Sequence, residues 1–377
     1  MRVLIVNSEH PPVGGGAGNA SAHLGKELVK MGDIVAILTS SYKNLPTEEI
    51  KDGVQIHRVR SLRKDISRSN PLEQLSFMIS GILEGLPLIR KWKPDVIIPF
   101  FGMPSGPVGL MGKVLFGIPY IVSLRGGDVP GFRPYDFALV HKLSSPLLRI
   151  IWKQAGAVVA NSQGLKTLAE KFAPGIPYQV IHNGVDLEFF HPPEVPPTKL
   201  NLLFVGRIVY QKGLDLLFDA LSDLLDLPWQ LILVGDGPAR NSLQEQAAAL
   251  NLEERITFLG WKSRLELQQL YQEASIFVFP SRDEGMPNAV LEAMAASLPV
   301  IASDIAGNEE LIQEGVTGLL VLKEDRVLLS QAIHELLIDP TKREQFGRAA
   351  RERVETLYSW TKVTQEYRQV TRTVMSD

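Results

Sequence analysis

Short apolar runs, many of them β-branched, alternate along the chain with longer segments whose apolar residues recur at helical spacing. Most runs are continuously apolar, which is typical of strands that helices cover on both faces. The predicted strands lie at residues 2–8, 33–40, 54–59, 94–101, 119–126, 155–162, 178–183, 200–207, 229–237, 255–261, 274–281, 298–304 and 317–323. Strand–helix alternation of this kind predicts an α/β protein with parallel sheets joined by right-handed crossovers.

A proline-rich stretch at residues 191–199 holds four prolines, which cannot continue a helix or a central strand. It predicts a semi-stiff connector between an N-terminal domain over residues 1–190 and a second domain that begins at residue 191. A chain of 377 residues is also too long for one hydrophobic core. We therefore expect two doubly wound, Rossmann-like domains with a cleft between them, in which ligands sit at the carboxyl ends of the strands.

The composition narrows the class of protein. The chain has 45% hydrophobic and 21% charged residues, as soluble globular proteins do. It has no cysteine, which excludes a disulfide scaffold and a thiolate zinc site and fits a reducing compartment. The first strand is too short for a signal peptide or a membrane span, so a cytoplasmic location is expected.

The net charge of −3 conceals an asymmetry between the two halves. Residues 1–190 carry 21 Lys and Arg against 15 Asp and Glu, a balance of +6, and the remaining residues carry 18 against 27, a balance of −9. A basic half suits an acidic or membrane-surface partner, although scatter between two domains would give the same numbers. Nucleic-acid binding is not expected, because the chain is slightly acidic and lacks a concentrated basic and aromatic surface.

A glycine-rich loop at residues 14–20 follows the first strand and precedes a predicted helix over residues 21–32. Such a loop allows backbone N–H groups to approach an anion at a helix N-terminus. The loop does not match the dinucleotide fingerprint, because Asn19 or Ser21 stands where the last Gly or Ala is required. A phosphate-facing loop and a simple tight turn both remain open.

Arg207 and Lys212 lie five residues apart, where one strand ends and a helix begins after Gly213. An arginine fork and a lysine point charge in these positions would hold a diphosphate from two sides. Taken alone, the same segment would also suit two solvated surface cations.

Two carboxylates, Glu284 and Glu292, lie eight residues apart around a turn-prone segment at residues 285–288. Pro287 and Asn288 mark a helix start with Asn288 able to cap it, so Glu284 precedes the helix and Glu292 lies about one turn inside. Free N–H groups at that start would stabilise an anionic leaving group, while the carboxylates accept hydrogen bonds from a polyol. A glycosidase pair is the alternative, but hydrolysis needs no diphosphate clamp.

In their order along the chain, these segments resemble the retaining glycosyltransferases of the GT4 family, which have the GT-B fold. The motifs are GGGAGN at 14–19, IHNGVDLEFF at 181–190, GRIVYQKG at 206–213, GDGP at 235–238, FLGW at 258–261 and the E-x7-E stretch from Glu284 to Glu292. The resemblance extends over nearly the whole chain. It implies a donor-binding domain at residues 191–357 and a C-terminal helix, about residues 358–377, that returns to the N-terminal domain.

The resemblance also implies roles for single residues. Arg207 and Lys212 would neutralise the donor diphosphate, Glu284 would contact the donor sugar, and Glu292 would bind the ribose hydroxyls. The other donor-binding positions implied are Gly15, Gly16, Gly206, Gly237, Trp261, Lys262, Gly285, Met286, Pro287 and Asn288.

The sequence departs from the family pattern at two places. Arg125 stands where many members have a histidine, although Asp128 remains, so an imidazole on the acceptor side is in doubt. Ser297 replaces a glycine usual in the family. The chain has no Asp-x-Asp pair, so we expect no metal or other cofactor, with the two cations and the helix N-terminus stabilising the leaving group instead.

Residues 57–68 hold five Lys and Arg interleaved with apolar residues. This segment would suit peripheral contact with the inner face of a membrane and a lipid-linked acceptor, and it would equally suit a solvated connection between a strand and a helix.

The sequence therefore predicts a retaining, metal-independent hexosyltransferase that uses a UDP- or GDP-linked sugar and an acceptor hydroxyl in the synthesis of a glycan, glycolipid or glycoconjugate. The alternatives are a nucleotide-sugar epimerase or a phosphorylase on a similar fold, and a non-catalytic nucleotide-sugar-binding subunit, which Arg125 would favour. The base, the sugar, the acceptor, the linkage and the oligomeric state do not follow from the sequence.

Overall fold

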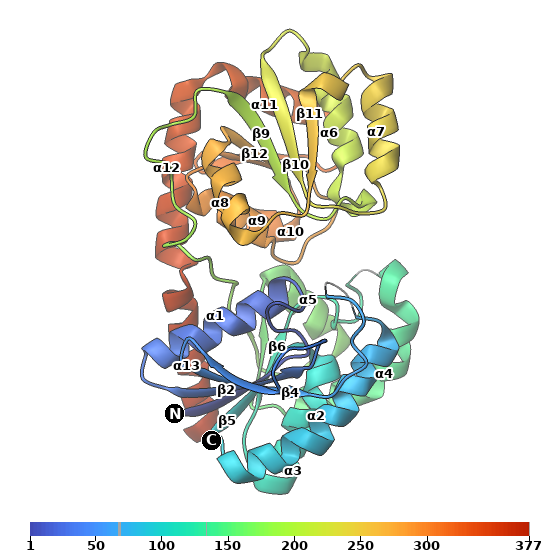
Figure 1. Ribbon diagram of the computed structural model, residues 1–377, viewed down its shortest axis with the longest axis vertical. Helices are drawn as coiled ribbons and strands as arrows, with labels where there is room; N and C mark the ends of the chain where they lie inside the picture. The colour runs from blue at the N-terminus through green and yellow to red at the C-terminus, as the bar shows by residue number, and fades with distance from the viewer. Residues whose placement is uncertain (67–68, 133, 377) are drawn as a thin grey trace. The chain divides into compact units, whose positions relative to one another are not determined.

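A computed structural model describes residues 1–66, 69–132 and 134–376, without the side chains of residues 134–140. The chain forms two compact units, shown in Figure 1. The N-terminal unit comprises Met1–Asn183 and Trp360–Asp377, and the C-terminal unit comprises Gly184–Ser359. Each unit is an α/β layer structure with its own hydrophobic core.

The N-terminal unit is built on a five-stranded sheet of order β3-β4-β2-β1-β5 and a three-stranded sheet of order β6-β7-β8. Two parallel bridges, from Ile97 to Tyr120 and from Phe100 to Ser123, connect β5 to the second sheet. All pairs are parallel except β3 with β4. The strands are β1 (Arg2–Val6), β2 (Ile34–Ser40), β3 (Glu48–Lys51), β4 (Val54–Val59), β5 (Val96–Pro99), β6 (Ile121–Leu124), β7 (Ala157–Ala160) and β8 (Tyr178–Val180).

Helices cover the sheets of this unit, and two of them, α2 and α5, begin at a side-chain cap. Asn70 and Glu73 form a capping box at the start of α2, and Ser162 caps α5. The helices are α1 (Gly16–Lys30), α2 (Pro71–Trp92), α3 (Gly106–Phe116), α4 (Pro134–Gln154), α5 (Gln163–Phe172) and α13 (Trp360–Ser376), with a π-helical turn η1 (Phe101–Ser105) before α3.

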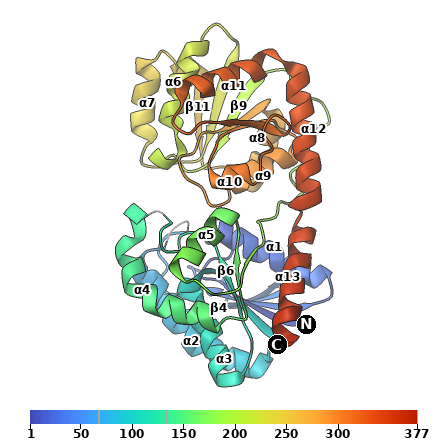
Figure 2. The same cartoon turned by 180° about the vertical axis from the view of Figure 1, so that it is seen from behind.

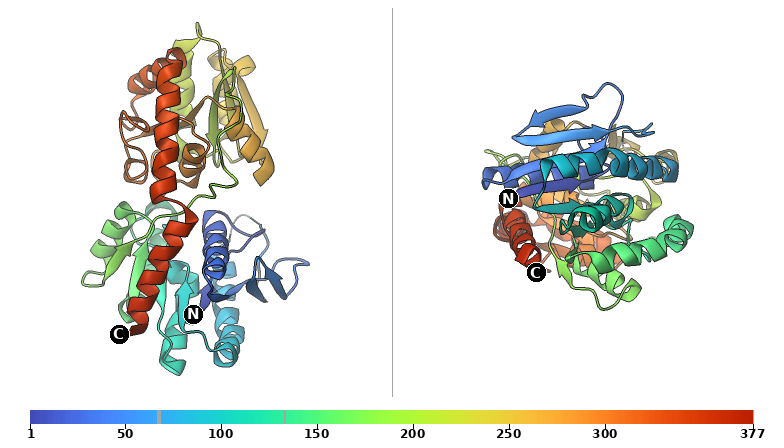
Figure 3. Two further views of the ribbon diagram at one scale, coloured as in Figure 1. Left: turned by 90° about the vertical axis from the view of Figure 1, so that its left-hand side faces the viewer. Right: turned by 90° about the horizontal axis from the view of Figure 1, so that it is seen from below.

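Helix α13 is part of the N-terminal unit although it closes the chain, and Figure 3 shows it beside α1. Its inner face joins the core that includes β1 and β2 through Trp360, Val363, Tyr367, Val370 and Val374. The Trp360 ring stacks on His23 of α1 at a centroid distance of 5.2 Å. The packing of an amphipathic face therefore fixes this helix on the unit.

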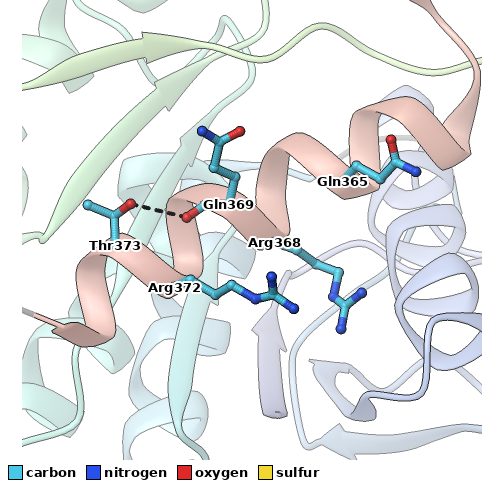
Figure 4. A pocket seen from close by; sticks show the side chains of 5 residues that line it. All are labelled: Gln365, Arg368, Gln369, Arg372 and Thr373. Atoms are coloured by element: carbon cyan, nitrogen blue, oxygen red, sulfur yellow. Dashed lines mark hydrogen bonds between the residues drawn. The ribbon is translucent and has the colours of Figure 1, made fainter.

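A buried carboxylate also holds α13. Asp33 accepts the N-terminal ammonium of Met1 at 2.9 Å and forms an ion pair with Arg368 at 2.9 Å. Figure 4 shows Arg368 and Arg372 projecting from α13, with Gln365, Gln369 and Thr373 on the same helix. Met1 and α13 thus meet at one side chain.

The C-terminal unit has a six-stranded, fully parallel sheet of order β11-β10-β9-β12-β13-β14. β9 lies in the middle, with β10 on one side and β12 on the other. The strands are β9 (Leu200–Val205), β10 (Trp229–Val234), β11 (Ile256–Gly260), β12 (Ile276–Phe279), β13 (Val300–Ser303) and β14 (Gly318–Val321).

The helices of the C-terminal unit lie on the two faces of this sheet, as Figures 1 and 2 show. They are α6 (Leu214–Leu221), α7 (Arg240–Ala249), α8 (Arg264–Glu273), α9 (Asn288–Ala295), α10 (Ala306–Glu309), α11 (Arg326–Ile338) and α12 (Pro340–Leu357), with short turns η2 (Tyr210–Lys212), η3 (Ser222–Leu224) and η4 (Glu253–Arg255).

Every strand predicted from an apolar run has a counterpart, and the predicted fold class, α/β with parallel Rossmann-like sheets, is confirmed. The sequence reasoning missed β3, because its residues are mostly charged and lie at an exposed edge of the sheet. It also placed the start of the first helix too late. α1 begins at Gly16, inside the glycine-rich loop, and not at Ser21.

Candidate functional site in the C-terminal unit

The loops after β9 and β12 leave neighbouring strands at the same edge of the sheet, where the strand order changes direction. In doubly wound sheets such a point opens a crevice in which ligands bind. These loops carry Arg207 and Lys212 on one side and Glu284 on the other. The structure therefore brings these three predicted site residues to one edge of one sheet.

Glycines let the loops approach one another closely. A Cβ atom on Gly235 would lie 2.0 Å from the carbonyl oxygen of Gly206, and one on Gly237 would lie 2.1 Å from that of Ile208. Gly213 has φ +65°, and a Cβ there would lie 2.1 Å from the carbonyl oxygen of Pro280, at the end of β12. Gly235 and Gly237 are thus required for close packing between the loops after β9 and β10, whereas a Cβ on Gly206 would lie 3.0 Å from the Phe204 ring.

Lys212 and Glu284 form an ion pair across the two loops. Their side chains are only 14% and 10% exposed, and the Lys212 ammonium lies 4.8 Å from the centroid of the Phe279 ring. A mostly buried pair has lost much of its hydration and therefore depends on its partner or on a ligand that replaces it. An incoming anion would meet Lys212 already in position.

Arg282 connects the same two loops, and the sequence reasoning did not single it out. Its backbone N–H donates to the Gln211 carbonyl at 2.7 Å, and its guanidinium donates two bonds of 2.8 Å to Asp215. The guanidinium also donates to Glu324 at 2.6 Å and stacks on the Tyr210 ring at 3.8 Å. A cation two residues before Glu284 was the available signal, but its partners lie far away in the sequence.

Glu292 lies on α9, with one carboxylate oxygen 2.9 Å from the Tyr271 hydroxyl that donates to it. Burial raises the pKa of Glu292 to about 7, although the bond from Tyr271 and the charge of Arg264 both act to lower it. Glu292 therefore binds its proton more tightly than an exposed glutamate does.

The segment between Glu284 and Glu292 packs closely against the residues around Gly307. Met286 and Pro287 are buried, and a Cβ on Gly307 would lie 2.8 Å from the Gly285 carbonyl oxygen. Pro287 occupies the cap position of α9 and Asn288 is its first helical residue, so the expected capping by the Asn288 side chain was wrong. Within the described residues, the cap residue of α9 makes no side-chain bond to the first N–H groups of the helix.

Trp261 and Lys262 follow β11, two strands away from β9. The Trp261 side chain is 63% exposed. The Lys262 ammonium lies 2.9 Å from Glu266, which forms the capping box of α8 with Ser263. Lys262 is thus engaged locally at a helix start.

The predicted acceptor-side residues lie together in the N-terminal unit. Asp128 accepts the backbone N–H groups of Gly102 at 2.7 Å and of Arg125 at 3.0 Å. The Arg125 guanidinium donates to Asn183 at 2.6 Å and to the Tyr367 hydroxyl at 3.1 Å, and it lies over the Phe100 ring. Arg125 therefore ties the end of β6 to α13.

The glycine-rich loop of the N-terminal unit already holds a carboxylate. The Gly15 N–H donates to Glu9 at 3.3 Å, and Gly16 is the first residue of α1. Burial raises the pKa of Glu9, while the bond from Gly15 and the charge of Arg63 lower it. Glu9, which the sequence reasoning passed over, thus occupies the helix end that was predicted to face an anion.

The cations of residues 57–68 do not all lie on one exposed face. Ser67 and Arg68 lie outside the described residues. Arg58 is buried, donates to the Pro46 carbonyl at 2.8 Å and pairs with Glu49. Arg63 is buried as well and donates to the Asp65 carbonyl at 2.8 Å. These two of its five cations therefore face inward.

Known proteins are similar to this chain in sequence and in fold. A family model described as Glycosyl transferases group 1 matches residues 186–353, and one described as Glycosyltransferase Family 4 matches residues 14–189. The glycogen synthase of Mycobacterium tuberculosis is 27% identical to the chain over 98% of this chain and 94% of its own length.

Solved structures agree on the fold. The sucrose-phosphate synthase of Thermosynechococcus elongatus is 24% identical, with a TM-score of 0.86 over 100% of this chain and 99% of that one. Anabaena HepE in complex with UDP-glucose is 20% identical, with a TM-score of 0.77 over 100% of both chains. The two units thus have the architecture of GT-B glycosyltransferases.

The two family models together extend over residues 14–353, and the chain belongs to the group 1, or GT4, glycosyltransferases. Enzymes of this family are retaining and use nucleotide sugars. The resemblance predicted from the order of the motifs is therefore confirmed.

Proposed function

We propose that the protein transfers a hexose from a UDP- or GDP-linked sugar to an acceptor hydroxyl, with retention and without a metal ion, in glycan, glycolipid or glycoconjugate synthesis. The observation that carries this proposal is the Lys212–Glu284 pair, which two interlocked loops hold at the edge of the C-terminal sheet. UDP is the first nucleotide to test, because Anabaena HepE was solved with UDP-glucose.

In the proposed mechanism the cations stabilise the leaving diphosphate. Lys212 and Arg207 offset the negative charge that grows on its oxygens as the glycosidic bond breaks, and the uncapped start of α9 adds backbone N–H groups. A diphosphate would compete with Glu284 for Lys212, which frees the carboxylate to accept hydrogen bonds from the sugar hydroxyls. Glu292 would accept those of the ribose.

Retention follows if the acceptor attacks the face that the diphosphate leaves. The new bond forms between the acceptor oxygen and the anomeric carbon, the bond from that carbon to the diphosphate breaks, and a leaving phosphate oxygen takes the acceptor proton. The protein contributes position and charge to this step, and no side chain needs to form a covalent bond.

The test begins with thermal unfolding in the presence of UDP, GDP, ADP or TDP and their common sugars, with and without EDTA. A ligand at about a hundred times its dissociation constant adds roughly 2.7 kcal/mol to the free energy of unfolding. We expect the nucleotides of one base to raise Tm, and to raise it equally with and without EDTA. Stabilisation that requires a divalent metal would contradict the proposed mechanism.

A non-catalytic nucleotide-sugar-binding subunit is the second candidate. Its supporting observation is Arg125, whose guanidinium donates to Asn183 and Tyr367 at a position where the family resemblance leads us to expect a histidine. That function predicts stabilisation by a nucleotide sugar without release of the nucleoside diphosphate in any acceptor mixture. An epimerase, in contrast, would change the sugar without any acceptor.

A further inference from the structure

Helix α2 is apolar on two opposite faces. Within the described residues it is the one helix long and apolar enough to cross a membrane, with 22 residues. Its inner face packs on the N-terminal sheet through Phe77 and Ile89. Gly85 allows close approach there, since a Cβ would lie 2.7 Å from a Leu38 methyl group. The helix is therefore an integral part of the α/β unit.

The outer face carries exposed leucine and isoleucine side chains. Leu72, Leu75, Ile79 and Leu83 are 71%, 46%, 48% and 68% exposed, and their spacing of three and four residues sets them in one stripe. A helix that covers a soluble sheet normally has a polar outer face. We name these four residues the α2 stripe.

The segment before α2 extends the stripe. Leu62 is 65% exposed, and its backbone N–H donates to the Ser76 hydroxyl at 3.1 Å, which holds it against the helix. Ile66 is 44% exposed, and its carbonyl accepts the N–H of Gly14 at 2.7 Å. The apolar surface thus reaches the glycine-rich loop at the carboxyl edge of the N-terminal sheet.

The charges beside the stripe are mainly positive. Over the described part of residues 60–92, the exposed cations are Arg60, Lys64, Arg90 and Lys91 and the exposed acids are Asp65 and Glu84. Backbone bonds from Lys64 to the Glu73 carboxylate and from Arg60 to the Glu84 carboxylate hold both cations next to α2. The positive balance of residues 1–190 acts in the same direction.

We propose that the N-terminal unit binds an anionic lipid surface through the α2 stripe, Leu62 and Ile66. Leucine and isoleucine side chains next to lysine and arginine match the boundary between acyl chains and anionic headgroups. The charge excess favours a lipid surface over a second copy of this chain, because like charges would repel across a symmetric contact. The docking does not depend on the proposed function. Only its consequence, an acceptor presented at the membrane, rests on that function.

The test is sedimentation of the purified full chain with vesicles of phosphatidylcholine alone and of phosphatidylcholine with about one third phosphatidylglycerol, at low and high salt. We expect binding to the anionic vesicles that weakens with salt. Leu75→Gln combined with Ile79→Gln should lower the fraction bound at least about tenfold, because two side chains no longer enter the acyl region. Arg60→Glu combined with Lys64→Glu should abolish the preference for anionic lipid.

The matched control is Val327→Gln combined with Ile338→Gln, which are 59% and 57% exposed on α11 of the C-terminal unit and should leave vesicle binding unchanged. The rise of Tm with UDP, measured on each variant, shows that the variants fold and tests the proposed function separately. Absence of vesicle binding, or equal binding of the stripe variant, overturns the proposal. Self-association without lipid that the stripe variant abolishes would assign the face to a second copy instead.

Discussion

At the scale of single residues, the candidate site rests on charged side chains whose partners come from another loop. Lys212 meets Glu284, and Arg282 meets Asp215 and Glu324. Removing one partner leaves the other partly buried and without its compensating charge. Substitutions here are therefore expected to act on both activity and stability, and the experiments must separate the two effects.

Lys212→Ala should lower kcat/KM by about two orders of magnitude or more, because it removes a charge that stabilises the leaving diphosphate. Steady-state release of the nucleoside diphosphate measures this loss, and a cooperative thermal unfolding transition without ligand shows that the variant is folded. Lys323→Ala removes an exposed cation of the same unit and should leave turnover unchanged. Turnover by Lys212→Ala close to that of the wild type would refute its assigned role.

The stability of Glu292→Gln relative to the wild type should increase as the pH rises. The pKa of Glu292 is raised to about 7 in the folded protein, from an unfolded value near 4.5, so the folded state binds the proton more tightly. Its contribution to the free energy of unfolding is present below the unfolded pKa and is lost as the pH rises through about 7.

Thermal unfolding at pH values on either side of this window checks the sign of the effect. The difference in Tm between Glu292→Gln and the wild type should shift toward the variant at the higher pH, by an amount worth about 1–3 kcal/mol. Glu253→Gln, at an exposed carboxylate, is the control. A difference in Tm that stays constant with pH would show that Glu292 does not titrate in this range.

At the scale of elements, the loops depend on contacts that only glycine permits. Gly213 and Gly315 have nearly the same positive φ, +65° and +69°. A Cβ on Gly213 would meet the Pro280 carbonyl oxygen at 2.1 Å, whereas one on Gly315 has no atom within 4 Å. The two positions therefore separate the cost of the conformation from the cost of the clash.

Gly315→Ala should cost about 1 kcal/mol of unfolding free energy, the usual cost of a left-handed non-glycine residue. Gly213→Ala should cost several kcal/mol more or displace the loop that carries Lys212. Urea unfolding of the two variants, with nucleotide binding as a second readout, makes the comparison. Equal losses would mean that the loop relaxes without cost.

The elements that the sequence could predict are those whose pattern is local, and the elements that it could not predict depend on contacts with distant residues. A continuous apolar run reports local burial, so the strands with that pattern were predicted. β3, the early start of α1 and the roles of Glu9 and Arg282 depend on partners elsewhere in the fold. Arg282 bonds to Asp215, 67 residues earlier, and no local pattern marks that pairing. The motif order predicted Lys212 and Glu284 as site residues, but it did not predict the ion pair between them.

At the scale of the whole molecule, the N-terminal unit is assembled from both ends of the chain. Ending the chain at Ser359 should unfold that unit, because the buried face of α13 and the bonds of Tyr367 to Ser123 and Arg125 would be lost. The C-terminal unit should keep its own cooperative unfolding transition. Limited proteolysis would then yield a protected fragment near residues 184–359.

A chain shortened by residues 375–377 is the control, since Met375 and Ser376 are exposed, and it should resist protease as the wild type does. An intact N-terminal unit in the chain that ends at Ser359 would show that α13 is dispensable.

Helix α13 also sets the order in which the protein matures during synthesis. Helix α13 leaves the ribosome after the whole C-terminal unit, so the first strands to emerge wait with one face of their core uncovered until α13 has been made. The C-terminal unit is continuous in the chain and has all its parts earlier. Of these two units, the one whose synthesis begins first is therefore completed after the other, which reverses the usual order of folding on the ribosome.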